Sequence, residues 1–179
     1  MIDIMLDWRD HFKDGRVIKL VKGDAVFRSE DEISSAYLVI SGSVSLERVL
    51  PNGDKLVLNV AHCGNLLAEA SLFTTHYHCD GIVLEETQIY KLKRADLLKR
   101  LEDKPQSLLQ MMQDNTAEIK RLRNQIEILR HQRVAERLDA WLLFNETNDE
   151  TLWVYVATEI GVSAPALYRE LAKRKKAGK

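Results

Sequence analysis

The chain has 179 residues, of which 45% are hydrophobic and 30% charged, and its formal net charge at pH 7 is −1. This length suits one large domain, or a sensor domain with a small second module. No apolar run approaches the roughly 20 residues that a membrane span needs, so we expect no membrane partner. The first ten residues are acidic and amphipathic, a pattern that predicts no signal peptide.

Cysteine usage and the lack of catalytic motifs narrow the function further. The chain has two cysteines, Cys63 and Cys79, which allow one disulfide at most and favour a reducing cytoplasm. They are too few for a four-cysteine iron–sulfur cluster. The sequence contains no phosphate-binding loop, nucleophile elbow or zinc-hydrolase motif. We therefore expect a cytoplasmic protein that is not an enzyme.

The first part of the chain predicts a β domain. Short alternating stretches, broken by turn residues, run from about residue 17 to residue 92. Many short strands at this spacing are typical of an antiparallel sandwich or barrel. The stretches are 17–21, 25–27, 36–40, 44–49 and 56–60, and the glycines between them are Gly23, Gly42, Gly53 and Gly64. We assign residues 1–104 to this domain.

A long helix is predicted next, over residues 105–133. Residues from Leu108 to Arg133 show the alternating spacing of four and three that defines a heptad repeat. β-Branched residues at position a with leucine at position d favour a parallel two-stranded coiled coil. The alternative is a helix that packs this stripe on its own domain. We expect a homodimer whose interface contains Ile119 and Ile126 at a, and Leu122 and Leu129 at d.

Residues 134–179 predict a helical module with a basic end. Ala157, Gly161 and Leu167 have the spacing of two short helices joined by a tight turn, as in a helix-turn-helix. Ser163 suits the N-cap of the second helix, and Pro165 suits its first turn. From Ser163 to the end, one acid, Glu170, stands against Arg169, Lys173, Arg174, Lys175, Lys176 and Lys179. A basic end of this kind favours contact with a polyanion, whereas the alternative is a solvated tail.

In this order of parts the chain resembles the catabolite-activator superfamily of bacterial regulators, the Crp–Fnr family. The resemblance covers residues 17–178 and rests on four stretches: 37–44 (YLVISGSV), 64–73 (GNLLAEASLF), the seam 119–129, and 160–163 (IGVS) with Leu167 and Arg169. It implies an α+β fold with an antiparallel, jelly-roll-like β-roll sensor domain, a long dimerisation helix and a shortened helix-turn-helix. It also implies a dimeric transcription regulator that binds double-stranded DNA, with RNA polymerase as a further partner.

The resemblance places an effector pocket in the β-roll. The residues it assigns to this pocket are Leu66, Glu69, Ala70, Ser71, Tyr77 and His78. Glu69 matches the glutamate that holds the ribose in members that bind cyclic nucleotides. Their phosphate-binding arginine has no counterpart, because no Lys or Arg occurs between Lys55 and Lys91. Leu122 and Arg123 replace polar residues that contact the adenine, so we expect an effector other than cyclic AMP.

The stretch 75–80 (THYHCD) stands where that arginine is expected. His76, His78 and Cys79 carry side chains with metal and haem ligand chemistry. In an extended segment His76 and His78 project to one face and Cys79 to the other. The alternatives are a polar loop with a packed cysteine, or a haem, metal or redox sensor. The sequence leaves the cofactor unknown.

The expected DNA-reading helix departs from the family pattern. Where the family has Ser-Arg-Glu-Thr, this chain has Ser-Ala-Pro-Ala at residues 163–166. Each lost bidentate base contact removes about 1–3 kcal/mol of discrimination. The residues expected to contact DNA are Ser163, Tyr168, Arg169, Lys173 and Arg174. We expect weakly specific binding, and the alternative is a dimeric sensor or interaction protein that no longer reads DNA.

Overall fold

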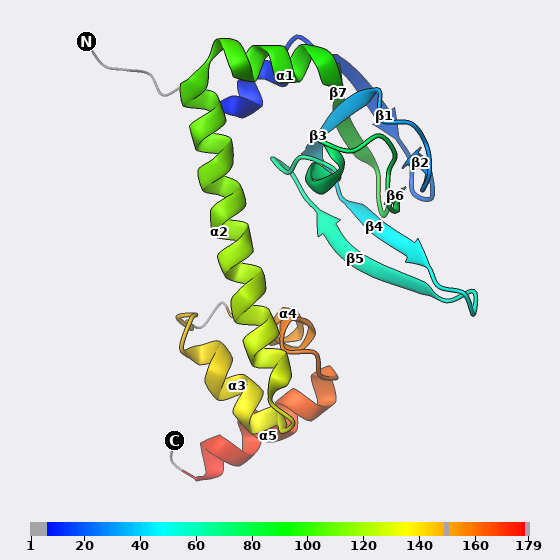
Figure 1. The fold of residues 1–179 in the computed structure, drawn as a ribbon. Helices are drawn as coiled ribbons and strands as arrows, with labels where there is room; N and C mark the ends of the chain where they lie inside the picture. Colours follow the sequence, from blue (N-terminus) through cyan, green and yellow to red (C-terminus); the bar gives the residue numbers. More distant parts are fainter. Residues whose placement is uncertain (1–6, 149–150, 178–179) are drawn as a thin grey trace. The chain divides into compact units, whose positions relative to one another are not determined.

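The computed structural model describes residues 7–148 and 151–177 (Figure 1). The acidic start at residues 1–6 and the last basic residue, Lys179, lie outside the described residues. The chain divides into two compact units, Met1–Met111 and Met112–Lys179. Within the described ranges no helix is long and apolar enough to cross a membrane. The fold is α+β with antiparallel sheets, as the sequence predicts.

The first unit contains two antiparallel sheets. Their strand orders are β1-β7-β3 and β2-β6-β4-β5. Each of the five predicted stretches forms a strand, and two further strands follow. The strands are β1 (Arg16–Leu20), β2 (Ala25–Phe27), β3 (Ser35–Ser41), β4 (Val44–Val49), β5 (Lys55–Ala61), β6 (Asp80–Val83) and β7 (Thr87–Lys93). The alternation of apolar residues places Val39, Val44 and Ile89, among others, in a common core.

The turn between β3 and β4 requires a glycine. Gly42 has φ +81°, and a Cβ at this position would overlap the side chain and backbone of Thr87. Only glycine adopts such a conformation at little cost while allowing this close approach. The Thr87 side chain lies fully buried and hydrogen-bonds with the backbone of Ser43, which fixes the β3–β4 hairpin against β7.

Short helices close one end of the first unit. These are η1 (Trp8–Phe12), η2 (Glu69–Ser71), α1 (Arg94–Asp103) and the beginning of α2 (Pro105–Arg130). Phe12, Leu97 and Met111 are buried in one apolar cluster with residues of β3 and β7. The three-part division at residues 105 and 134 stays a prediction, since the boundary between the compact units falls inside α2. The first turns of α2 belong to the first unit because Met111 is part of its core.

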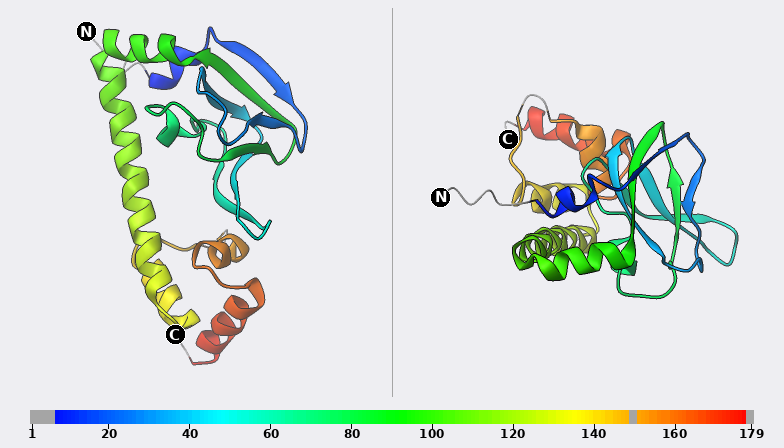
Figure 2. Two further views of the ribbon diagram at one scale, coloured as in Figure 1. Left: turned by 45° about the vertical axis from the view of Figure 1, so that its right-hand side comes forward. Right: turned by 90° about the horizontal axis from the view of Figure 1, so that it is seen from above.

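The second unit combines the rest of α2 with α3 (Val134–Leu142), α4 (Trp153–Glu159) and α5 (Ala164–Lys176), which gather around the end of α2 (Figure 2). Leu138, Ile160 and Leu167 are fully buried in its core, which also includes Ile128 of α2. The heptad prediction is wrong at Arg133, because α2 ends at Arg130. Arg133 is the N-cap of α3, and its backbone N–H donates to the carboxylate of Glu136 at 3.3 Å.

Candidate functional site

The cassette residues surround the short helix η2. Ala68, directly before it, has a left-handed conformation with φ +51°. Glu69 is half-buried and Ala70 exposed, whereas Ser71 is fully buried. The Ser71 Oγ and the His78 Nδ1 lie 2.8 Å apart, within hydrogen-bonding distance. The structure therefore brings Glu69, Ser71 and His78 to one region of the β-roll.

Leu66 and Tyr77 lie in the core of the β-roll instead. Leu66 belongs to the apolar cluster beneath α1. Tyr77 stacks on Phe27 with ring centroids 3.9 Å apart, and its hydroxyl donates to the carbonyl of Ser35 at 2.9 Å. Burial raises the pKa of the Tyr77 hydroxyl above its usual range. Tyr77 is therefore a core residue of the β-roll whose hydroxyl is hydrogen-bonded to the backbone of Ser35.

A cation that sequence reasoning missed lies close to this region. Burial raises the pKa of the Cys79 thiol, the positive charge of Arg48 opposes that rise, and Asp80 and Glu69 add to it. Arg48 is exposed on β4, one residue after Glu47, which pairs with Asp80 across the sheet. Arg48 lies before Lys55 in the chain, outside the cassette, and only the pairing of β4 with β6 brings it near Cys79.

The histidine and cysteine side chains of residues 76–79 alternate as predicted. His76 and His78 are exposed, while Tyr77 and Cys79 are buried. The His76 Nδ1 lies 2.9 Å from the hydroxyl of the neighbouring Thr75. In the part of the chain that the structure describes, no group of three His, Cys, Asp or Glu residues is placed to hold a metal ion. A buried, protonated Cys79 fits a packing role better than a ligand role.

The residues of the predicted dimer seam lie on a half-exposed apolar face of α2. Ile119, Leu122, Ile126 and Leu129 are between 41% and 54% exposed. About half of the stripe is therefore exposed in the single chain, although Leu129 also lies close to Gly161 in the turn between α4 and α5. Large exposed apolar residues in a row are typical of an interaction surface.

The helices α4 and α5 with their turn form a helix-turn-helix. Ala157 is buried where the helices meet, and Gly161 has φ +63° in the turn between them. A Cβ at Gly161 would come within 2.7 Å of Leu129 Cδ2 at the end of α2. Ser163 stands at the N-cap of α5 with extended backbone, although its side chain makes no capping hydrogen bond. Pro165 lies in the first turn, as predicted.

Most of the residues predicted to contact DNA have exposed side chains, but one of them is hydrogen-bonded within the second unit. Ser163, Tyr168, Arg169 and Lys173 are exposed on α5. The side chain of Arg174 is only 21% exposed. Its guanidinium donates to Asp139 Oδ1 at 2.7 Å, Glu170 Oε1 at 3.0 Å and the carbonyl of Ala135 at 2.9 Å. Arg174 therefore ties α5 to α3, and its hydrogen-bonding capacity is largely used inside the unit.

Comparison with known proteins identifies the family. Residues 17–104 match the cyclic nucleotide-binding domain. Transcriptional activatory protein AadR of Rhodopseudomonas palustris is 30% identical over 121 residues, which are 67% of this chain and 49% of that protein. The chain belongs to the Crp/Fnr family.

Solved structures agree with this Crp/Fnr assignment. The sensor domain of the transcriptional regulator DNR from Pseudomonas aeruginosa is 26% identical with a TM-score of 0.53, and the match covers 64% of this chain and 78% of that chain. The c-di-GMP responsive regulator CLP from Xanthomonas campestris shares the fold over 96% of this chain and 92% of its own, with a TM-score of 0.63 and 18% identity. This Crp/Fnr chain spans about half the length of the curated relatives that it matches.

One residue of this Crp/Fnr protein was missed by sequence reasoning and links α2 to the helix-turn-helix. Arg137 of α3 donates from Nη1 to the carbonyls of Ile160 and Gly161, each at 2.9 Å. Its Nε donates to the carbonyl of His131 at 2.8 Å, and its Nη2 donates to that of Leu129 at 3.4 Å. One guanidinium thus joins the turn of the helix-turn-helix to the end of α2. Composition alone could not separate this arginine from the other surface cations.

Proposed function

We propose that this chain is a dimeric Crp/Fnr-type transcription regulator that binds double-stranded DNA through α5 in the cytoplasm, with RNA polymerase as a further partner. The observation that carries the proposal is the helix-turn-helix itself. Leu167 is fully buried, whereas Ser163, Tyr168 and Arg169 are exposed together near the beginning of α5. This is the end of a recognition helix that enters the major groove.

The half-exposed apolar face of α2 supports a dimer. A parallel pair of these helices would bury Ile119, Leu122, Ile126 and Leu129, which the single chain leaves about half exposed. A dimer also places two α5 helices for two half-sites about one helical turn of DNA apart. The α2 seam therefore supplies the symmetry that a regulator of this class requires.

For the effector, we infer a molecule other than cyclic AMP. Glu69 is present for a ribose, but residues 56–90 carry no Lys or Arg for a cyclic phosphate. Amides at a helix N-terminus contribute only about 0.3–2 kcal/mol toward an anion, which does not replace a bidentate guanidinium. A haem, metal or redox effector at His76, His78 and Cys79 is the alternative, and the burial of Cys79 argues against it.

Fluorescence anisotropy with labelled random duplexes at several salt concentrations tests DNA binding. We expect affinity that varies little with sequence and falls steeply with salt, since contacts to phosphates dominate when few bases are read. Lys173→Ala is expected to reduce the log–log salt slope by about one without changing sequence preference. Arg169→Ala is expected to remove the preference that exists. The matched control is Lys22→Ala, an exposed lysine of the β-roll, which should leave both quantities unchanged.

Two results would change the proposal. If no duplex binds even at low salt, the chain is a dimeric sensor or interaction protein that has lost DNA reading. Ala164 and Pro165, where relatives carry base-reading residues, are the specific reason to keep this second function. If the protein discriminates strongly between sequences, Tyr168, Arg169 or the shape of the DNA carries recognition instead.

A further inference from the structure

One polar side chain interrupts the apolar stripe of α2. With Ile119 at position a and Leu122 at position d, Asn115 also occupies position d, directly between Met112 and Ile119. Met112 and Ile119 are 57% and 50% exposed. Asn115 is exposed as well, and its side chain forms no hydrogen bond with any residue in the described ranges. The donors and the acceptor of this amide are therefore available to a partner.

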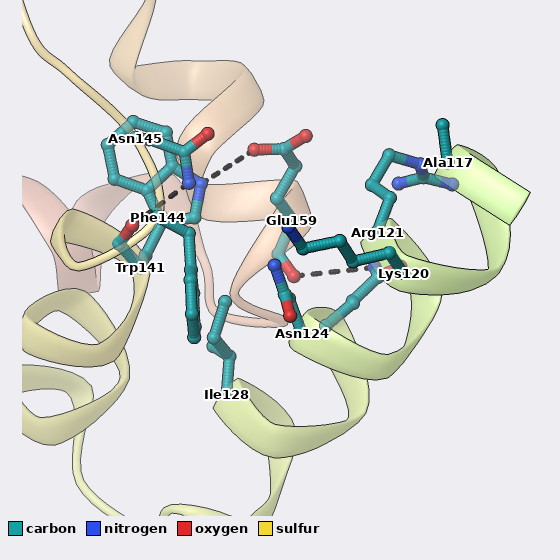
Figure 3. A pocket seen from close by; sticks show the side chains of 10 residues that line it. Ala117, Lys120, Arg121, Asn124, Ile128, Trp141, Phe144, Asn145 and Glu159 are labelled. Carbon is teal, nitrogen blue, oxygen red and sulfur yellow. Dashed lines mark hydrogen bonds between the residues drawn. The ribbon is translucent and has the colours of Figure 1, made fainter.

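The other side of α2 is turned toward its own unit. Lys120, Asn124 and Ile128 lie beside a pocket that α3 and α4 complete, as Figure 3 shows. Ile128 is 4% exposed and belongs to the core of this unit. These three residues occupy positions b, f and c, which face away from the partner in a two-stranded coil. The face that α2 offers to a second copy of the chain is therefore the one that carries Asn115.

A parallel pair in matched register satisfies this amide. In such a pair each core residue meets the same residue of the partner, so that Asn115 faces Asn115. A carboxamide has two N–H donors and one acceptor oxygen, and two facing carboxamides can donate to each other. On either side of this level, Ile119 and Met112 meet their own counterparts. The seam then contains a polar pair within an apolar interface.

Other arrangements place the amide against hydrocarbon. A slip of one heptad sets Asn115 of one chain against Leu122 and that of the other against Leu108. An antiparallel pair aligns positions d with positions a, so Asn115 meets methionine or isoleucine. A buried polar group without a partner loses its hydrogen bonds to water and gains none in return. Each of these arrangements contains two such groups.

The charges beside the seam favour the same arrangement. Arg123 and Arg130 at position e are exposed. In a parallel pair position e faces position g, which holds Glu118 and Gln125, whereas in an antiparallel pair position e faces position e and the arginines meet. Glu118 already pairs with Arg121 of its own chain at 2.7 Å, so the parallel pair gains no new ion pair there. It is favoured because it avoids like charges.

We propose that Asn115 selects the partner, the register and the direction of the α2 pair, by pairing its amide with that of Asn115 in a second copy of this chain. This inference rests on the proposed dimer. A buried asparagine in a coiled-coil core fixes register and oligomer state at a cost in stability. It also discriminates between partners, because a related chain with an apolar residue at this level would leave the amide unsatisfied. Asn115 thus favours pairing of the chain with itself.

Spin labels on α2 test the arrangement. The label is attached through Glu127→Cys in a Cys63→Ser background, since Glu127 is exposed at position b and Cys79 is buried. Double electron–electron resonance on the dimer should give a single short distance between the two labels. Asn115→Leu should add longer distances: a slip of one heptad moves the labels about 10 Å along the helix axis, and an antiparallel pair separates them further. Gln113→Leu, which removes an exposed amide at position b, should keep the single distance.

A second variant decides whether Asn115 faces the partner. Asn115→Asp places two carboxylates together in the seam and should raise the dissociation constant of the dimer at least about tenfold by sedimentation equilibrium. Gln113→Glu should leave it unchanged. The role of Asn115 is overturned if Asn115→Leu retains the single distance, or if the two acidic variants weaken the dimer equally. A monomeric wild type would overturn the proposed dimer as well, so the two failures are distinguishable.

Discussion

The imidazole of His11 in η1 is buried, with 6% of the residue exposed and Nε2 without a hydrogen-bond partner in the described residues. Burial lowers its pKa below the ordinary value of 6.5, and the positive charges of Lys104 and Arg100 lower it further. Asp10 and Asp14 oppose this effect only in part. The folded first unit therefore favours neutral His11, whereas the unfolded chain binds a proton near pH 6.5.

We expect the first unit to lose stability as the pH falls through and below 6.5. The unfolded state binds more protons than the folded state in this range, so the free energy of unfolding rises with pH and is greatest above 6.5. Urea unfolding of the wild type and His11→Phe between pH 5 and about 8 measures this dependence. The variant should show a smaller decrease, while His62→Gln, at an exposed position, should behave like the wild type. Identical slopes for wild type and His11→Phe would contradict the argument.

Residues around Glu69 predict that cyclic nucleotides bind poorly. Calorimetry at micromolar concentration should show no saturable heat with cyclic AMP or cyclic GMP, because the cassette lacks its own cation. Saturable binding would point to Arg48 as the missing charge, since it is the cation that acts on Cys79 from β4. In that case Arg48→Gln should abolish the heat, and Lys55→Gln at the next strand should not.

For single residues, the sequence shows which side chains are charged but not which of them form ion pairs or hydrogen bonds within the protein. The sequence does not distinguish Arg169 from Arg174 as a DNA contact. In the structure, however, Arg174 donates hydrogen bonds to Asp139, Glu170 and a backbone carbonyl of α3. Asp139 is 35 residues away in sequence. A linear pattern cannot show such pairing, because it depends on how α3 packs against α5.

At the level of elements, Arg137 should control the stability of the joint between α2 and the helix-turn-helix. Its guanidinium meets four carbonyls, three of them at 2.8–2.9 Å. Arg137→Ala leaves these acceptors without their donor and should destabilise the second unit by about 2–3 kcal/mol. Thermal unfolding followed by tryptophan fluorescence measures the loss, since Trp141 and Trp153 lie in this unit.

The controls for this prediction separate packing from hydrogen bonding. Arg137→Lys keeps the charge and most of the stem but cannot reach four acceptors, so it should recover less than half of the lost stability. Arg133→Ala removes a neighbouring arginine whose side chain is 82% exposed and should change stability by less than about 0.5 kcal/mol. Full recovery by Arg137→Lys would show that the charge alone matters.

Elements with a clear period were predictable, and those without one were not. The alternation in residues 17–60 predicted β1 to β5, and the heptad predicted α2. Nothing in the pattern predicted η1 or η2, because a helix of one turn shows no period. The heptad prediction ran past the end of α2 at Arg130 because spacing alone does not show where Arg133 turns to cap α3.

For the whole molecule, we expect a dimer of about twice 20.6 kDa by light scattering. Leu122→Arg places a charge in the centre of the α2 seam and should produce a monomer, since an unpaired charge does not bury in a two-helix interface. Glu127→Gln makes a charge change of the same size, +1, at position b, away from the seam, and should stay dimeric. A stable wild-type monomer at micromolar concentration would contradict the prediction of a dimer through the α2 seam.

The position of Gly161 against Leu129 has a thermodynamic consequence. Leu129 belongs to the proposed dimer seam, while Gly161 lies in the turn that orients α5. Dimerisation through α2 and DNA binding through α5 share this contact, so the two equilibria are linked. Linkage is reciprocal: if dimerisation increases the affinity for DNA by some factor, DNA binding increases the affinity between the two chains by the same factor. A duplex with two half-sites would then act as an assembly factor. The monomer–dimer equilibrium of this protein would shift with the supply of its own binding sites.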